Sequence, residues 1–236
     1  DKNLSDILNE NYRDLSPFQI LENSIKTDFK NKMVYVCSFG TESAIILHMI
    51  SRIDKSLPVL LLNTNFLFEE TIIYKNYLLK KLDLKNFKEI YPDKNDLKVN
   101  DSKNSLWKSD PDSCCNIRKV LPLKKELENY SAWVSGRKAY HEGERKKIKS
   151  FEILDEKIVI NPLANVEKDF VNSYFENNKI DRHPLFEKGY LSIGCIHCTE
   201  KTFNSADPRS GRWSNTLKTE CGIHYSNYNK NNAKKP

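Results

Sequence analysis

Residues 33–50 read MVYVCSFGTESAIILHMI, and this stretch contains a complete strand–loop–helix unit. Its first part, 33–39, is a short run rich in β-branched and aromatic residues, which predicts a buried strand. Its last part, AIILHMI, is too apolar for the surface of a globular protein and must pack against a sheet. The intervening SFGTES is therefore expected at the carboxyl end of a strand, where a helix begins.

The same alternation of strands and helices continues along the chain. Apolar residues at helical spacing over 4–29, interrupted at SPF, predict N-terminal helices. Strands are predicted for PVLLLNT (58–64), KEIYP (88–92) and SAWVSG (131–136), and a helix for FEETIIYKNYLLKKL (68–82). This order indicates an α/β fold, with a Rossmann-like parallel sheet and flanking helices.

Three polar loops follow predicted strands: SFGTES, LNTN and WVSGRK. Ligands of open parallel sheets bind at the carboxyl ends of the strands, so we expect these loops to converge on one crevice. From about residue 181 the chain is rich in loops, and from Tyr225 its composition predicts a disordered tail. We expect an N-terminal helical segment, a main α/β domain and a mobile C-terminal segment, over residues 1–30, 31–205 and 206–236.

Composition restricts the class of function. The net charge of +6 over 236 residues is modest, which favours a local basic site for an anionic ligand over a general nucleic-acid surface. No run of 18 apolar residues predicts a membrane span, and the N-terminus does not resemble a signal peptide, which favours a cytoplasmic protein. Six cysteines are then more typical of metal or redox groups than of a disulfide framework.

Arginine is rare, with 8 residues against 30 lysines. Lysine can replace arginine at a solvated surface, but not where a planar fork must bind an oxyanion through two hydrogen bonds. Clustered arginines therefore indicate an anion site, unless the clustering arose by chance. Five of the eight fall in three short windows: Arg118, Arg137, Arg145, Arg209 and Arg212.

The loop CSFGTES (37–43) fits phosphate or sulfate. Gly40 permits a tight turn, and the amides and hydroxyls that follow can surround an oxyanion at a helix N-terminus. The sequence is equally compatible with an ordinary strand-to-helix turn with Ser and Thr caps. Cys37, inside the predicted strand, is expected to be a core residue.

The remaining cysteines form two pairs and a single residue. Cys114–Cys115 and the CxxC of GCIHCT together offer four thiolates, which suit tetrahedral zinc or an iron–sulfur cluster; the vicinal pair favours a cluster. A redox CxxC beside an accidental pair is the competing interpretation, and His197 is expected to be a bystander. Cys221 lies in the polar stretch KTECGIH, where an accessible thiol could act as a nucleophile; a buried structural cysteine is the competing interpretation.

These motifs together resemble one known family. CCNIRKVLPLKKEL, GCIHCT, SGRW and KTECGIH follow SFGTES and LNTNFLFEET in that order, and the combination is similar to assimilatory adenylyl-sulfate (APS) reductases of the iron–sulfur type, within the APS/PAPS reductase family. The likeness covers about residues 30–225. It implies an adenine nucleotide alpha hydrolase-like fold with a modified PP-loop, and reduction of APS to sulfite and AMP in sulfate assimilation and cysteine biosynthesis. The implied reductant is thioredoxin or a glutaredoxin-like dithiol. The resemblance implies no nucleic-acid or membrane partner, and it is compatible with a homo-oligomer.

The resemblance also implies roles for single residues. Cys221 would be the nucleophile that carries a thiosulfonate, with Lys119 and His224 as further catalytic residues. Arg118 and Lys119, beside the vicinal cysteines, would face the anionic substrate. Cys114, Cys115, Cys195 and Cys198 would bind a [4Fe–4S] cluster. The implied substrate-binding positions are Ser38, Phe39, Gly40, Thr41, Glu42, Ser43, Leu62, Thr64, Arg137, Arg145, Arg209 and Arg212.

The chain departs from the family pattern at two places. Asn63-Thr64-Asn65 stands where Asp-Thr-Gly is expected, and SGRKAYHEGER stands where many members have Gly-x-Arg-Arg. The first departure leaves open whether the backbone after the second strand can approach the ligand closely. The second leaves open how Arg137 and Arg145 divide their roles.

Three further functions stay open. Reductases of the 3′-phosphorylated substrate (PAPS) share the loop and ECGIH but lack the two cysteine pairs, which favours APS here. A PP-loop nucleotide transferase with a structural metal would keep the loop but has no use for ECGIH. A cluster-bearing nucleic-acid-binding protein would need a continuous basic stripe.

Overall fold

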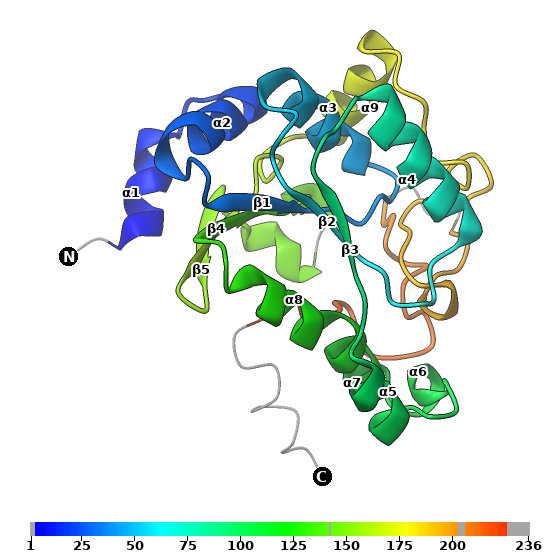
Figure 1. Cartoon of the computed structure of the whole chain (residues 1–236). Coiled ribbons are helices and arrows are strands. Elements are labelled where there is room, and N and C mark those ends of the chain that lie inside the picture. Colours follow the sequence, from blue (N-terminus) through cyan, green and yellow to red (C-terminus); the bar gives the residue numbers. More distant parts are fainter. Residues whose placement is uncertain (1–2, 142, 203–205, 226–236) are drawn as a thin grey trace.

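A six-stranded sheet forms the frame of the molecule (Figure 1). The computed structural model describes residues 3–141, 143–202 and 206–225. The strand order is β3-β2-β1-β4-β6-β5, with every pairing parallel except that of β5 with β6. The strands are β1 Met33–Val36, β2 Val59–Leu62, β3 Phe87–Ile90, β4 Ala132–Val134, β5 Phe151–Leu154 and β6 Lys157–Ile160. The predicted α/β class and the four predicted strands are confirmed.

Helices cover both faces of the sheet because successive strand residues point to opposite sides. In β1, Met33 and Tyr35 join one apolar core and Val34 joins the other. The larger core receives apolar residues from α1 Leu4–Asn11, α2 Pro17–Asn23, α3 Ser43–Ile53, α4 Glu69–Lys81 and α9 Lys168–Asn177. The smaller core is covered by α8 Leu121–Leu127. Six of the eleven residues of α3 are buried, as its apolar sequence predicts.

The hairpin of β5 and β6 was not predicted. Asp155 and Glu156 form its two-residue turn, and both have positive φ, at 46° and 65°. Tight hairpin turns usually carry Asn-Gly or Asp-Gly at these positions, so Asp-Glu gives a weak signal. The hairpin places an antiparallel strand at one edge of the sheet, next to α1.

The vicinal cysteines lie in an irregular helix. α7 Pro111–Cys115 continues through a π-helical turn, η2 Asn116–Val120, into α8. Pro122 has no N–H group, and its ring would clash with the carbonyl of residue 118 in a regular α-helix. The wider turn accommodates it, with the N–H of Leu121 donating to the carbonyl of Asn116. Turns of this kind are frequent at functional sites.

The other elements are short. They comprise the helices α5 Lys94–Asn100 and α6 Leu106–Ser109, the π-turn η1 Ser24–Asp28, and the 3₁₀ turns η3 Ala139–His141, η4 Gly143–Lys147 and η5 Ile196–Cys198. The loop-rich character expected after residue 181 is present in the described part of that segment, whereas the predicted disordered tail lies, apart from Tyr225, outside the described residues. No helix in the described ranges is long and apolar enough to span a bilayer.

Candidate active site

A cavity of about 210 Å³, the main cavity, lies at the carboxyl ends of β1, β2 and β4. Two of the three expected loops line it, through Ser38–Ser43 without Phe39 and through Ser135–Lys138. From LNTN only Leu62 does so. The wall is completed by segments distant in sequence, namely residues 192–194, 209–213 and 220–224. Cys221, Lys119 and His224 all face this space.

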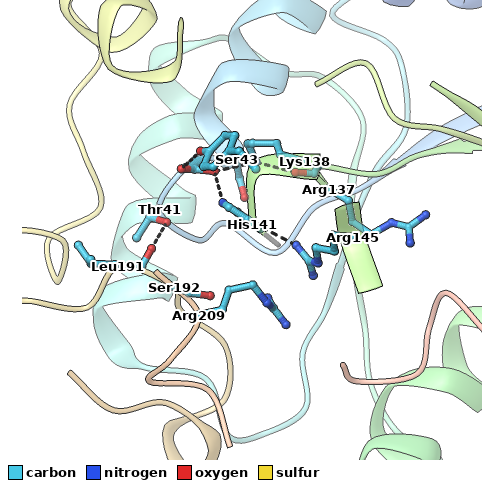
Figure 2. A network of polar contacts seen from close by, with 12 residues as sticks. Thr41, Ser43, Arg137, Lys138, His141, Arg145, Leu191, Ser192 and Arg209 are labelled. Atoms are coloured by element: carbon cyan, nitrogen blue, oxygen red, sulfur yellow. Dashed lines mark hydrogen bonds and ion pairs between the residues drawn. The ribbon is translucent and has the colours of Figure 1, made fainter. Parts of the chain in front are cut away.

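The loop after β1 presents polar groups to the cavity. The backbone N–H of Gly40 donates to Ser43 Oγ at 3.1 Å. Thr41 Oγ1 donates to the carbonyl of Leu191 at 3.0 Å (Figure 2). Phe39 does not belong to the site. Its φ of 50° turns the ring into the core, where it packs edge-on against Phe87 at 5.8 Å between ring centroids. One aromatic ring therefore anchors the loop in the core, while the polar residues of the loop line the main cavity.

Glu42 is the centre of a buried ion-pair network that the sequence did not reveal. Its carboxylate lies 2.7 Å from Lys138 Nζ and 3.3 Å from His141 Nε2, and it accepts a hydrogen bond from Tyr140. Burial opposes ionisation of Glu42, but Lys138 and His141 outweigh it and hold the pKa of this carboxyl well below its usual range. Glu42 therefore neutralises Lys138. The run RKAYH (137–141), directly after a strand, was the feature of the sequence that could have indicated this network.

Two arginines hold the segment that carries Cys221. Arg145 donates to both carboxylate oxygens of Glu220, and Arg209 Nη2 donates to the carbonyl of Thr219 at 2.7 Å. Burial opposes ionisation of Glu220, but its hydrogen bonds with Arg145 and the charge of Arg209 lower the pKa of this carboxyl. Burial and the neighbouring Arg145 lower the pKa of Arg209 to about 10, so it stays a cation near neutral pH.

His224 is packed against Trp133, with the two rings stacked at 4.9 Å between centroids. Burial lowers the pKa of His224 well below its usual value, and Arg137, Arg145 and Arg209 lower it further. The imidazole is therefore neutral near neutral pH, and it is suited to hydrogen bonding but not to donating a proton as imidazolium. Arg137 itself pairs with Glu152.

Lys119 and Arg212 are the cations of the main cavity with no carboxylate within ion-pair distance among the described residues. Arg212 Nε donates to the carbonyl of Cys198 at 3.1 Å, and its Cζ lies 4.5 Å from the ring centroid of Trp213. A Cβ at Gly194 would lie 2.2 Å from Arg212 Nη2, so glycine is required for this close approach. These two side chains can bind an anion without breaking an existing ion pair.

The four paired cysteines line a second, smaller cavity, the thiol cavity. Lys119 lines both cavities and stands between them. None of the cysteines forms a disulfide. The CxxC loop is fixed by a backbone hydrogen bond from Ile196 to Phe66 at 2.8 Å. The residues around the thiol cavity are Cys114, Cys115, Cys195, Cys198, Thr64, Phe66, Trp107, Arg118, Lys119 and His197.

Two residues expected to contact substrate serve the thiol cavity instead. Thr64 is fully buried, and its Oγ1 lies 3.1 Å from Cys195 Sγ. Arg118 is 1% exposed and forms a buried ion pair with Asp101 at 2.6 Å, so the expectation that it faces the substrate is wrong. Adjacent helical residues point in different directions, and here Arg118 turns inward while Lys119 reaches the main cavity.

The metal-ligand geometry is not preformed. Among the described residues, no group of three or more His, Cys, Asp or Glu side chains is arranged to hold a metal ion. The donor set nonetheless suits an iron–sulfur cluster, because four free thiols from two segments share one cavity. His197 lies at the rim of that cavity, with its ring stacked on Trp107 at 4.1 Å between centroids.

Comparison with known proteins identifies relatives over most of the chain. Residues 32–201 match the model of the phosphoadenosine phosphosulfate reductase domain. An adenosine 5′-phosphosulfate reductase of Chelativorans sp. is 46% identical over 189 residues, covering 80% of this chain and 77% of the relative. One of Mesorhizobium japonicum is 40% identical over 215 residues, covering 91% and 85%.

Solved structures show the same fold. The phosphoadenylyl-sulfate reductase of Candida auris, in a phosphate complex, is similar with a TM-score of 0.71 and 25% identity, covering 86% of this chain and 98% of the other. The FMN adenylyltransferase of Candida glabrata is similar with a TM-score of 0.57 and 13% identity, covering 86% and 74%. The second likeness concerns the fold alone.

Proposed function

Because the chain belongs to the phosphoadenosine phosphosulfate reductase family, we propose that it reduces adenosine 5′-phosphosulfate to sulfite and AMP in sulfate assimilation. The chain is an oxidoreductase that acts on a sulfur group. The observation that carries the proposal is the main cavity, where the thiol of Cys221 meets Lys119 and Arg212 beside the polar loop after β1. This arrangement brings a nucleophile, cations and an oxyanion loop to one place.

The reaction that fits this site is attack on sulfur. APS is a mixed anhydride of phosphate and sulfate, so its sulfur is electrophilic and AMP is a competent leaving group. The Cys221 thiolate forms a bond to sulfur while the bond from sulfur to the phosphate oxygen breaks, and AMP carries away the electron pair. The enzyme then holds a Cys221 thiosulfonate.

A dithiol completes the turnover. We propose that a carrier of the thioredoxin or glutaredoxin type attacks the sulfur of Cys221, which releases sulfite and forms a mixed disulfide. The second thiol of the carrier resolves this disulfide and restores the Cys221 thiol. The two electrons come from the carrier, which is oxidised to its disulfide. The half-buried position of Cys221 at a cavity wall leaves its thiol within reach of such a partner.

The protein contributes electrostatics and position. Two anions, the thiolate and APS, must approach each other, and the positive charges of Lys119 and Arg212 offset their repulsion. The hydroxyls of Ser38 and Ser43, which line the main cavity, can donate to phosphate oxygens as negative charge develops on AMP. One donor of this kind typically contributes about 3 kcal/mol to transition-state stabilisation.

We propose that the four thiols of the thiol cavity hold a [4Fe–4S] cluster. The proposal rests on donor chemistry and on the shared cavity, since the coordination geometry is not preformed. When bound, such a cluster supplies a local electrostatic field and a fixed scaffold beside Lys119. Anaerobic purification followed by iron and sulfide analysis tests it: four of each per chain are expected, and a protein that binds only zinc would contradict it.

The proposed reaction is tested with pure protein, APS and a thioredoxin system under anaerobic conditions. We expect sulfite and AMP to appear in equal amounts, at a rate that depends on the dithiol. Hydrolysis of ATP without sulfite release would instead support the PP-loop nucleotide transferase. Release of AMP without sulfite would contradict the reductase assignment.

A further inference from the structure

Cys221 lies in a segment with no helix or regular strand. Residues 213–225 consist of turns, bends and irregular backbone, so regular backbone hydrogen bonds do not fix the nucleophile. Its position depends on side-chain contacts made by its neighbours in sequence. Glu220, directly before Cys221, makes the strongest of these, because its carboxylate binds two arginines from different parts of the chain.

We propose that Arg145 and Glu220 form an ion-pair clasp that holds Cys221 over the main cavity, so that Arg145 positions the nucleophile and does not bind substrate. This inference rests on the proposed function, and it gives Arg145 a role different from the one that the family resemblance implies. Arg145 donates through Nε to one carboxylate oxygen and through Nη2 to the other, at 2.9 Å for the second contact. Such paired bonds restrict both distance and orientation.

The third nitrogen of Arg145 is also engaged. Nη1 lies 3.3 Å from His141 Nδ1, and the other ring nitrogen of His141 lies 3.3 Å from Glu42 (Figure 2). Burial lowers the pKa of His141 although Glu42 opposes this, so the ring is neutral and Nδ1 can accept a hydrogen bond. A continuous polar chain thus runs from the loop after β1 through His141 and Arg145 to Glu220. Each of the three nitrogens of Arg145 thus already has a protein partner, and three of its five N–H groups are engaged.

The remaining arginines differ in this respect. Arg209 uses Nη2 for the carbonyl of Thr219, and among the described residues its Nε and Nη1 make no hydrogen bond and remain available. Arg212 binds a carbonyl and has no carboxylate partner there. Arg209 therefore supports the clasp and keeps two nitrogens for substrate, whereas every nitrogen of Arg145 already has a protein partner. The side chains of Arg145 and Glu220 are 13% and 11% exposed, so their ion pair is largely shielded from solvent.

The clasp predicts that two variants with opposite charge changes behave alike. Arg145→Gln and Glu220→Gln should each release the segment and increase the rate at which iodoacetamide alkylates Cys221, by about fivefold or more; the double variant should add little, since the two residues act as one unit. A purely electrostatic effect would differ in sign, because removing a cation disfavours the thiolate and removing an anion favours it. The measurement is alkylation of the Cys221 peptide in the holoenzyme, followed by mass spectrometry.

Binding and kinetics separate positioning from substrate recognition. In both variants the Kd for AMP should stay within about twofold, while kcat with APS falls about tenfold or more and KM changes little. Arg145→Lys keeps the charge but not the paired hydrogen bonds, so it should restore only part of the loss. Lys149→Gln, which removes an exposed cation paired with Asp6 at 3.5 Å, is the matched control and should change none of these quantities.

The opposite pattern overturns the inference. If Arg145→Gln weakens AMP binding tenfold while Cys221 alkylation is unchanged, Arg145 binds substrate; if the two variants shift alkylation in opposite directions, their effect is electrostatic. The alkylation and AMP measurements require no turnover. A wild-type enzyme that fails to reduce APS would therefore refute the proposed function without deciding the clasp, which these two measurements decide on their own.

Discussion

At the scale of single residues, the chemical role of a side chain was easier to predict than its ion-pair partner. Cys221, Lys119 and Arg212 could be selected from residue type and motif, and all three line the main cavity. The acids that neutralise Lys138 and Arg145 could not be assigned, because Glu42 and Glu220 meet these two cations across 75 or more positions in sequence. Local sequence carries no information about such pairs. Arg118 was misplaced because its partner Asp101 lies in a different element, at the end of α5.

Arg212→Lys tests whether the guanidinium matters beyond its charge. Lysine cannot keep the bond to the Cys198 carbonyl and present a planar fork to the cavity at once. We expect kcat/KM for APS to fall by an amount equivalent to about 2–3 kcal/mol of transition-state stabilisation. Arg13→Lys, at an exposed position, is the control and should leave kcat/KM for APS unchanged. Equal losses in both variants would mean that the arginine clustering is accidental.

At the scale of elements, the strand–loop–helix units were predictable because their apolar patterns are long and unambiguous. The hairpin of β5 and β6 and the π-turn before α8 were not, because each depends on one or two residues whose conformation is fixed by packing. Asn65 is a useful case. It replaces the expected glycine yet adopts φ of 67°, a conformation that asparagine tolerates better than most residues.

The contact between α4 and the segment after α9 gives a prediction about pH. His183 is 1% exposed; its Nδ1 accepts from the N–H of Leu185 at 3.1 Å, and its Nε2 lies 3.0 Å from Thr71 Oγ1. Burial lowers the pKa of His183 to about 4, although Glu70 opposes this. The unfolded chain therefore binds a proton near pH 6.5 that the folded protein binds only near pH 4. The stability that this histidine contributes is complete above pH 6.5 and is lost as the pH falls to about 4, on the order of 3 kcal/mol.

His183→Asn isolates this contribution. Asparagine keeps an acceptor for the Leu185 N–H but does not titrate, so its free energy of unfolding should vary less between pH 6.5 and 4 than that of the wild type. Urea unfolding at several pH values in this window measures the difference. Parallel curves for the two proteins would show that His183 does not set the acid sensitivity.

At the scale of the whole molecule, the distribution of charge bears on substrate choice. The cations of the main cavity come from the segments after β4, from η2 and from the C-terminal part. The loop after β1 and the end of β2 contribute none, since residues 36–47 and 59–70 contain no Lys or Arg. A 3′-phosphate placed near these two segments would lack a cationic partner there.

We therefore expect APS to be preferred over PAPS. The ratio of the kcat/KM values should be at least about tenfold, or about 1.4 kcal/mol in transition-state binding. Competition between the two substrates, with sulfite release as the readout, measures this ratio directly. Parity or a preference for PAPS would contradict the charge argument while leaving the reaction type intact.

The central claim is that Cys221 attacks the sulfur of APS, and trapping the intermediate tests it most directly. Protein mixed with APS in the absence of any thiol should acquire one sulfonate group per chain, located by mass spectrometry on the peptide that contains Cys221. Cys221→Ser should lack the adduct and keep the properties of the thiol cavity, because Cys221 is not one of its residues. An adduct on another cysteine, or sulfite formation that survives the substitution, would contradict the account.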